Sequence, residues 1–325
     1  MTSDSAEDVD AGLQRAAYNL SVDKVAARVV AAFDAAGVAS ILLKGASFAT
    51  WLYPAGGRAY GDVDLLVRRD QLKTATRVLN ALGYFDGQEG YALVERHPES
   101  SEFVKPGQRI IVDLHTNLHW LSDAARTWNV LSGETEALML GETPVRCLDI
   151  PARAMHVALH AAHHGLAGPQ PHDRGGQTGE DLRRALDVVA PSEWRRAHEI
   201  AAAIGALDAF GFGLRLDPRG VSVSDALGLT GECVPDVWAQ RAPFHIPQGR
   251  GALTLHRLRA EPRLLVRCAV IARWCVPSRA RVRAVADTRV GHTSLVGAYV
   301  EYWYDAARAI PAARRGSRRL RGAQP

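Results

Sequence analysis

The chain has 325 residues, 47% of them hydrophobic, and a formal net charge of +4. It contains no apolar run of about eighteen residues, so we expect no membrane-spanning helix, and its polar, acidic start does not look like a signal peptide. The four cysteines form no Cys-x-x-Cys pair. This argues against a disulfide framework and favours reduced thiols in the cytoplasm.

The first predicted elements are a helix, a strand and a second helix. Residues 1–20 are expected to be flexible, and residues 21–36 show apolar side chains at helical spacing. Residues 38–43 then read as a short buried strand that runs through the turn 44–47 into a helix over 48–53. Free amides and the positive dipole end at the start of a helix suit phosphate. A tight turn with a capping serine is the simpler interpretation of the same residues.

Asp62 and Asp64 lie in the next predicted strand. Side chains alternate along a strand, so these two acids share one face, and Val63, Leu65 and Val67 share the other. Mg²⁺ commonly binds one or two carboxylates together with substrate phosphates. We therefore expect a metal site here, with Asp64 as an exposed ligand whose neutralisation costs little stability. Asp-x-Asp alone is a common pattern and does not establish catalysis.

A third acid follows in a later strand. A helix is predicted over residues 71–82, and two or three antiparallel strands over residues 84–115. In the last strand, residues 109–115, alternation places Asp113 and His115 on the same face. Asp113 is therefore a candidate metal ligand. His115 is a candidate substrate contact, and the alternative is an ordinary hydrogen-bonded strand residue.

A mostly helical region begins at Pro151. Helical spacing of apolar side chains predicts helices over residues 152–166, 180–189, 192–206 and 264–276. In the last of these, the apolar side chains have a spacing that suits packing against the rest of the protein. We expect residues 151–310 to form a helical domain and residues 311–325 a basic, disordered tail.

The first helix of this region carries a histidine cluster, made of His156, His160, His163 and His164. Imidazoles four residues apart on a helix could chelate zinc, although no Cys or Glu ligand accompanies them at a familiar spacing. Polar packing against the sheet domain and lining of a substrate cleft are two further interpretations, and packing is the preferred one.

Charge is distributed unevenly along the chain. Residues 241–325 contain seventeen arginines, no lysine and four acids, a balance of +13, which leaves −9 for residues 1–240. A basic segment could bind an anionic partner, but an arginine-rich surface is also ordinary. The segment lacks interleaved aromatic residues, so we do not expect nucleic acid as a partner.

The order of these elements resembles the polymerase-beta-like nucleotidyltransferase superfamily. The chain is more closely similar to a bacterial branch, the uncharacterised nucleotidyltransferase family, over about residues 38–120 and more loosely to about residue 285. In the superfamily pattern a Gly-Ser pair follows the first strand; Gly45-Ala46 stands there in this chain, with Ser47 displaced by one. The matching motifs are Leu42-Leu43-Lys44-Gly45, Leu52-Tyr53, Arg58, Asp62-Val63-Asp64-Leu65-Leu66-Val67, Leu82-Gly83-Tyr84 and Val112-Asp113-Leu114-His115.

The resemblance implies an α+β fold. A polymerase-beta-like nucleotidyltransferase domain, with a small mixed sheet and flanking helices, would occupy residues 21–147, followed by the mostly helical domain. Asp62, Asp64 and Asp113 would be the catalytic residues and would hold two Mg²⁺ ions, with Mn²⁺ as a substitute. The implied nucleotide-binding residues are Lys44, Gly45, Ala46, Ser47 and Arg58.

The role of Arg58 has an alternative, and further residues are candidates to line the substrate site. Arg58 could hold a triphosphate as a bidentate fork, or it could order its loop through a salt bridge. The candidate substrate-lining residues are His115, His160, His163 and Asp187.

The implied reaction is magnesium-dependent transfer of a nucleoside monophosphate from an NTP, such as ATP, to a small-molecule or peptide acceptor in natural-product biosynthesis. The acceptor would enter between the two domains. Three alternatives remain at this point. The same fold could transfer a sugar or another group from a phosphate-linked donor, it could be a catalytically silent binding module, or it could add nucleotides to RNA.

Overall fold

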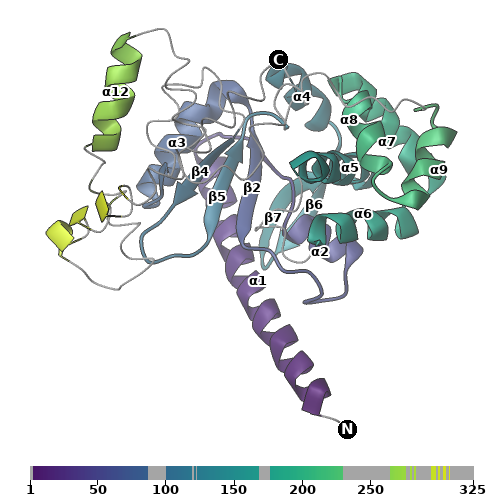
Figure 1. The fold of residues 1–325 in the computed structure, drawn as a ribbon, viewed down its shortest axis with the longest axis horizontal. Helices are drawn as coiled ribbons and strands as arrows, with labels where there is room; N and C mark the ends of the chain where they lie inside the picture. The colour runs from purple at the N-terminus through teal and green to yellow at the C-terminus, as the bar shows by residue number, and fades with distance from the viewer. Residues whose placement is uncertain are drawn as a thin grey trace.

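The computed structural model describes residues 3–86, 100–118, 121, 123–167, 176–229 and 264–275, with short runs and single positions between 279 and 307. A seven-stranded sheet in the order β3-β4-β5-β2-β1-β7-β6 forms its centre (Figure 1). The pairs β2–β5 and β1–β7 are parallel and the other pairs are antiparallel. The strands are β1 (Ser40–Leu42), β2 (Asp62–Val67), β3 (Phe85–Asp86), β4 (Ser100–Val104), β5 (Ile111–His115), β6 (Thr135–Leu140) and β7 (Thr143–Leu148).

Helices cover both faces of this sheet, with α5 to α9 gathered together on one side in Figure 1. None of the described helices is long and apolar enough to cross a membrane. The helices are α1 (Ser3–Ala35), α2 (Ala46–Leu52), α3 (Leu72–Ala81), α4 (Ala124–Leu131), α5 (Ile150–Ala167), α6 (Gln177–Val188), α7 (Pro191–Ile204), α8 (Leu207–Leu214), α9 (Pro218–Ala226) and α12 (Leu264–Cys275).

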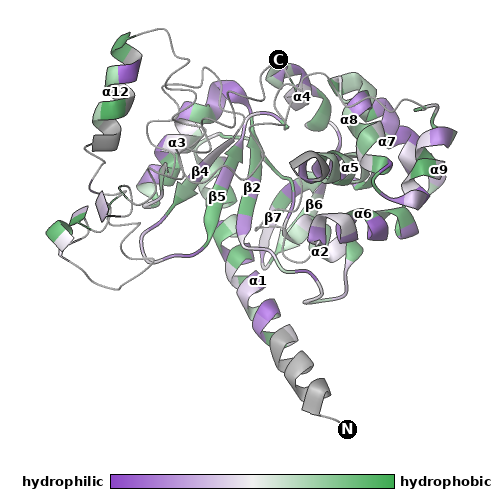
Figure 2. Cartoon of the chain, viewed as in Figure 1, coloured by the Kyte–Doolittle hydropathy of each residue, from purple (hydrophilic) through white to green (hydrophobic). Residues whose placement is uncertain are grey.

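The two faces of the sheet belong to two hydrophobic cores. Val63, Leu65 and Val67 of β2 pack with α1 and α3, whereas Leu66 of the same strand packs with the core of the helical region. The central strands are accordingly hydrophobic along most of their length in Figure 2. The alternation predicted for β2 is thus confirmed, and Asp64 lies on the face that α5 covers.

The expected mixed sheet with flanking helices, followed by a helical region, is confirmed, but the N-terminal segment differs. Residues 1–20 were expected to be flexible, yet α1 is continuous from Ser3 to Ala35. Its middle is fixed by a buried contact: the Nδ2 atom of Asn19 donates a hydrogen bond to the carbonyl oxygen of Arg58 at 2.7 Å. The sequence interpretation placed no strands over residues 135–148, where β6 and β7 form a hairpin.

Helix α12 differs from its expected environment. Its range is close to the predicted one, but its apolar side chains do not pack as expected: Leu264 is 69% exposed, Leu265 84% and Ile271 45%. Figure 1 draws α12 at the upper left, on the opposite side of the sheet from α5 to α9. The expected basic tail, residues 311–325, lies outside the described residues.

Candidate functional site

The candidate site is built on two neighbouring parallel strands. In the register of β2 and β5, Asp64 lies directly opposite Asp113, and Leu66 lies opposite His115. Because residues two apart in a strand share a face, the side chains of Asp64, Asp113 and His115 all point toward the helical region. The pairing of the strands therefore brings together residues about fifty positions apart in the sequence.

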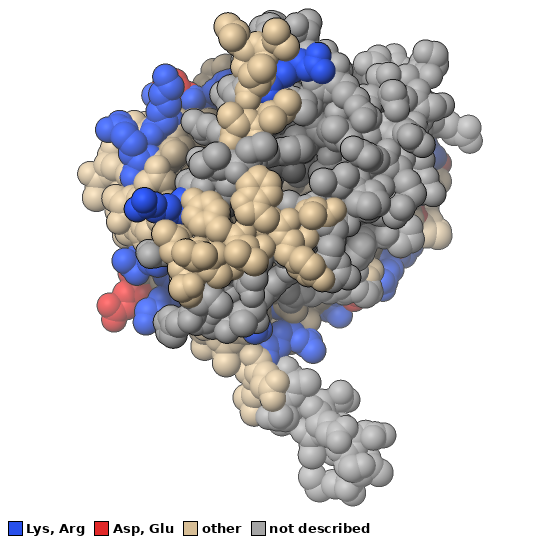
Figure 3. All heavy atoms as spheres, turned by 60° about the vertical axis from the view of Figure 1, so that its left-hand side comes forward, with Lys and Arg blue, Asp and Glu red and all other residues tan. Residues whose placement is uncertain are grey.

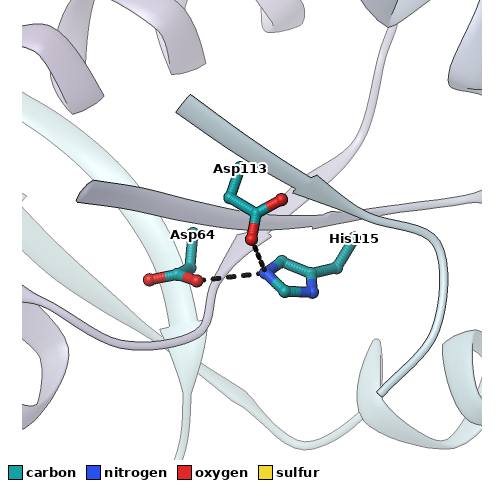
Figure 4. A group of neighbouring side chains, drawn as sticks. All are labelled: Asp64, Asp113 and His115. Atoms are coloured by element: carbon teal, nitrogen blue, oxygen red, sulfur yellow. Dashed lines mark hydrogen bonds and ion pairs between the residues drawn. The ribbon is translucent and has the colours of Figure 1, made fainter. Parts of the chain in front are cut away.

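These three side chains form a compact group (Figure 4). The Nε2 atom of His115 lies 3.0 Å from Oδ1 of Asp64 and 3.2 Å from Oδ2 of Asp113. One potential ligand atom from each residue lies within 4.8 Å of the others. The group is therefore small enough to surround a single metal ion.

Lys44 provides a second cation beside Asp64. Its Nζ atom lies 2.8 Å from Oδ1 of Asp64, and the Asp64 side chain is only 1% exposed. The expectation of an exposed Asp64 is therefore wrong, because the strand places this carboxylate under the helical region. Neutralising Asp64 would leave Lys44 without its buried partner and would remove one of the two carboxylates beside His115, so it would cost stability.

The charges of the site shift one another's pKa values. Burial by itself would raise the pKa of Asp64, but the charges and hydrogen bonds of Lys44 and His115 outweigh it and lower that pKa below its ordinary value. Burial would likewise lower the pKa of His115, but Asp113 and Asp64 raise it to about 10. Without a bound cation, His115 is thus protonated at neutral pH, lies against both carboxylates and shares that of Asp64 with Lys44.

Asp62 lies outside the compact group. The sequence predicted one site formed by Asp62, Asp64 and Asp113, but Asp62 is the exposed first residue of β2 and lies opposite Ile111, not Asp113. Asp62 is still close enough to interact with the site, because the negative charge of Asp64 raises the pKa of Asp62. Asp62 is therefore placed at the edge of the site, one strand repeat from Asp64.

Two carboxylate oxygens of the site lack partners. Oδ2 of Asp64 and Oδ1 of Asp113 are buried and accept no hydrogen bond from the described residues. Buried polar atoms are almost always paired, so an orphaned carboxylate oxygen indicates a position where a cation or water completes the site. Oxygen donors suit Mg²⁺, and an added imidazole also suits Mn²⁺. The residues present therefore fit a divalent metal ion.

The turn after β1 brings the backbone close to the site. Gly45 has φ +65°, a backbone conformation that favours glycine, and a Cβ atom there would contact the ring of Tyr60 at 3.4 Å. Ser47 is fully buried in α2, so its hydroxyl faces the interior and not the solvent. Of the predicted phosphate contacts in this turn, only Lys44 has a side chain that is partly exposed and directed to the acidic group.

Arg58 makes the salt bridge that was the alternative to a phosphate contact. Its Nε and Nη2 atoms lie 2.9 and 2.8 Å from the two carboxylate oxygens of Asp181 in α6, and both side chains are buried. The hydroxyl of Tyr53 donates to the same carboxylate at 2.7 Å. The guanidinium also lies 5.5 Å from the ring centre of Phe48. These contacts fix the loop between α2 and β2 to the helical region.

The histidine cluster lies on α5, beside Lys44 and Phe48. His156 is buried with its ring edge-on to Phe48, and burial, with Lys44 as a smaller cause, lowers its pKa to about 3. This agrees with the packing interpretation for His156. His160 and His164 face each other, with their Nε2 atoms 3.2 Å apart. Burial, followed by the charge of Lys44, lowers the pKa of His160 well below its ordinary value.

Asp187, the last predicted substrate-lining residue, lies apart from the others. Its side chain is 58% exposed and pairs with Arg219 of α9, at the outer edge of the helical region in Figure 1. The acid of α6 that contacts the loop before β2 is Asp181. A signal for it exists in the sequence: Asp181 shares helical spacing with Thr178, Leu182 and Ala185, which form the buried face of α6.

Comparison with known proteins gives a family. One solved structure, described as an antigenic nucleotidyltransferase-like protein from Paracoccidioides brasiliensis, is 13% identical and covers 65% of this chain and 94% of its own, with a TM-score of 0.37. No curated protein matches the sequence. The sequence pattern of a family described as uncharacterised nucleotidyltransferase matches residues 10–218, which is more than half of the chain. The chain therefore belongs to this uncharacterised nucleotidyltransferase family.

Proposed function

We propose that this protein is a divalent-metal-dependent nucleotidyltransferase that moves a nucleoside monophosphate from an NTP to a small-molecule or peptide acceptor. The observation that carries the proposal is the pairing of Asp64 with Asp113 in adjacent parallel strands, with one unpartnered buried oxygen on each. Membership of the nucleotidyltransferase family supports the same chemistry.

Asp64 and Asp113, with His115 beside them, would hold the metal, and Asp62 would add a carboxylate at the edge of the strand. Bound divalent ions, Mg²⁺ or Mn²⁺, would neutralise the phosphate charge and hold the entering and leaving oxygens in line. His115 must give up its proton if it is to ligate the ion, because only the neutral imidazole has a lone pair. The protein's contribution to such a reaction is mainly positioning and charge stabilisation.

Lys44 is the residue that we assign to the phosphates. Its ammonium group compensates Asp64 in the absence of a metal, at 2.8 Å. With a divalent ion bound at Asp64, Lys44 would be free to bind a phosphate oxygen as a point charge. Gly45 would allow the backbone to approach the phosphates closely. Arg58 would act indirectly, because Asp181 already occupies its donor fork.

The acceptor would lie between the site face of the sheet and α5, where His160 and His163 are candidates to line its path. A small molecule or peptide is preferred to nucleic acid because the arginine-rich residues 241–325 lack interleaved aromatic residues. On the face drawn in Figure 3, the Lys and Arg side chains of the described residues are scattered around the rim and do not form one continuous stripe. A natural-product acceptor, which the family resemblance implies, is part of this proposal.

The test is transfer of radioactive label. Purified protein is incubated with Mg²⁺ or Mn²⁺, cell extract as a source of acceptor, and each NTP carrying label at either the α or the γ phosphate. We expect α label, but not γ label, to enter a product. Asp113→Asn should abolish the transfer, and the matched control is Asp70→Asn, which changes an exposed acid paired with Arg68.

Three outcomes would contradict the proposal. Incorporation of γ label would indicate phosphoryl transfer instead. Transfer of the sugar from a labelled nucleotide sugar would favour the alternative reaction with a phosphate-linked donor. Equal activity of Asp113→Asn and wild type would show that the acidic group is not needed for transfer.

A further inference from the structure

The facing histidines of α5 form a second group of potential metal ligands, separate from the acidic group. His160 and His164 are one helical turn apart, which places their side chains on the same face of α5. Their Nε2 atoms lie 3.2 Å apart, and the ring centres are 4.5 Å apart with the planes at 68°. The two ring nitrogens therefore converge on one point beside the helix.

This separation suits a chelated ion. Two nitrogens bound to one tetrahedral ion at the usual zinc–nitrogen distances of about 2.0–2.1 Å are roughly 3.3 Å apart. The observed 3.2 Å agrees with that value and requires no movement of the helix. A hydrogen bond from one imidazole to the other would give a similar distance, so the two interpretations must be separated by experiment.

The other ring nitrogen of His160 decides which nitrogen can carry the proton of the neutral ring. This nitrogen, Nδ1, is buried and has no hydrogen-bond partner among the described residues. Because Nδ1 of His160 accepts no hydrogen bond from the described residues, it can carry the proton of the neutral ring, which leaves the lone pair of Nε2 available to an ion.

We propose that His160 and His164 form a bidentate site for a borderline transition-metal ion of the Zn²⁺, Co²⁺ or Ni²⁺ class. Imidazole nitrogen prefers such ions, whereas the carboxylate oxygens of Asp64 and Asp113 prefer Mg²⁺ or Mn²⁺. His163 lies beside His164, with ring centres 5.2 Å apart, but does not join a compact group of three ligands. Two protein ligands leave the remaining positions of the ion open to water or to a donor group of the acceptor.

The test is a titration of the full chain with Co²⁺ in the presence of saturating Mg²⁺, which occupies the acidic group. Visible absorption reports the coordination geometry of bound Co²⁺. Calorimetry gives the affinity of the protein for Co²⁺ and the number of ions bound per chain. The variants are His160→Gln and His164→Gln. His198→Gln removes a partly buried histidine of α7 and is the matched control, and Asp113→Asn separates this site from the acidic group.

We expect wild type, His198→Gln and Asp113→Asn to bind one Co²⁺, and both α5 variants to bind it at least about tenfold more weakly, since loss of outer-shell partners alone commonly costs this much. Circular dichroism of each variant checks that it is folded. If His160→Gln does not fold, the variant His164→Gln still provides the test, because His164 is only half-buried. Absence of Co²⁺ binding by wild type would leave only the hydrogen bond. Binding unchanged in both α5 variants, or lost in Asp113→Asn, would overturn the proposal.

Discussion

Replacement of Asp181 by leucine tests how the helical region is attached to the site. Asp181 accepts two hydrogen bonds from Arg58 and one from Tyr53, and the Arg58 and Asp181 side chains are 7% and 1% exposed. The substitution removes the acceptor and leaves the Arg58 guanidinium buried beside Phe48 without a countercharge. The damage should therefore appear as lost stability of the folded protein, and not only as lost activity.

The expected cost is large because the remaining charge cannot reach water. Removing one partner of a buried ion pair typically costs about 3–5 kcal/mol, and the Tyr53 hydroxyl loses an acceptor worth about 1 kcal/mol. Replacing both charged residues, as Arg58→Met with Asp181→Leu, should recover most of the loss, since well-packed apolar residues often replace a buried pair at little cost. The two single substitutions are therefore expected to be strongly non-additive.

Urea unfolding followed by tryptophan fluorescence measures these differences as a double-mutant cycle. The exposed pair Arg68–Asp70, with side chains 50% and 64% exposed, is the control, and Asp70→Leu should cost no more than about 1 kcal/mol. A loss of less than about 1 kcal/mol in Asp181→Leu would refute the reasoning. So would a double variant that is as unstable as the sum of the two single ones.

Three further predictions concern phosphate binding, acid stability and the tail. Lys44→Ala should weaken NTP binding about tenfold by calorimetry, because one charge-assisted hydrogen bond is lost; an unchanged affinity would move the phosphates elsewhere. The pKa of His156, about 3, is below its ordinary 6.5, so the unfolded chain takes up the proton first as the pH falls. Protonation of His156 in the unfolded chain should lower the free energy of unfolding by about 2 kcal/mol between pH 7 and pH 5. The free energy of unfolding of His156→Phe, measured with urea, should therefore fall by about that much less over the same range. If wild type and His156→Phe show the same dependence of this free energy on pH, His156 is not buried as a neutral ring. Deleting residues 314–325 should leave label transfer intact, whereas tight RNA binding at physiological salt that the deletion abolishes would favour an RNA-modifying enzyme.

The two central strands can be predicted well from the sequence, because the alternation of apolar and polar side chains is visible within each short segment. Alternation alone gives the shared face of Asp113 and His115 in β5, and it gives the buried face of β2. Asp62 shows where this reasoning stops. Alternation says which face a residue occupies, but the register between strands decides which residue lies opposite it, and the register places Asp64, not Asp62, beside Asp113.

The partners of Arg58 could not be predicted because they are distant in the sequence. Both a phosphate fork and a loop salt bridge suit an arginine in a glycine-bearing loop, and the choice depends on Asp181, 123 residues away. No local pattern specifies such a contact, although an acid on the apolar face of a predicted helix is a reason to search for a buried cation.

Two other differences have local causes. The hairpin β6–β7 turns at Gly141, which has a positive φ, and a Gly-X pair between two alternating runs is a hairpin signal that could have been recognised. Helix α12 was predicted by apolar spacing, but spacing indicates only that a face is apolar and not that a partner covers it. The exposure of Leu264 and Leu265 could not be deduced from the pattern.

Binding of Mn²⁺ is the most direct test that the face formed by Asp64 and Asp113 is a metal site. Electron paramagnetic resonance follows the loss of the free-ion signal as protein is added, with and without an NTP. We expect wild type and the Asp70→Asn control to bind Mn²⁺ equally, and Asp113→Asn to bind it at least about tenfold more weakly. No binding by wild type in the presence of any NTP, or equal binding by Asp113→Asn, would contradict the metal site and the nucleotidyl transfer proposed from it.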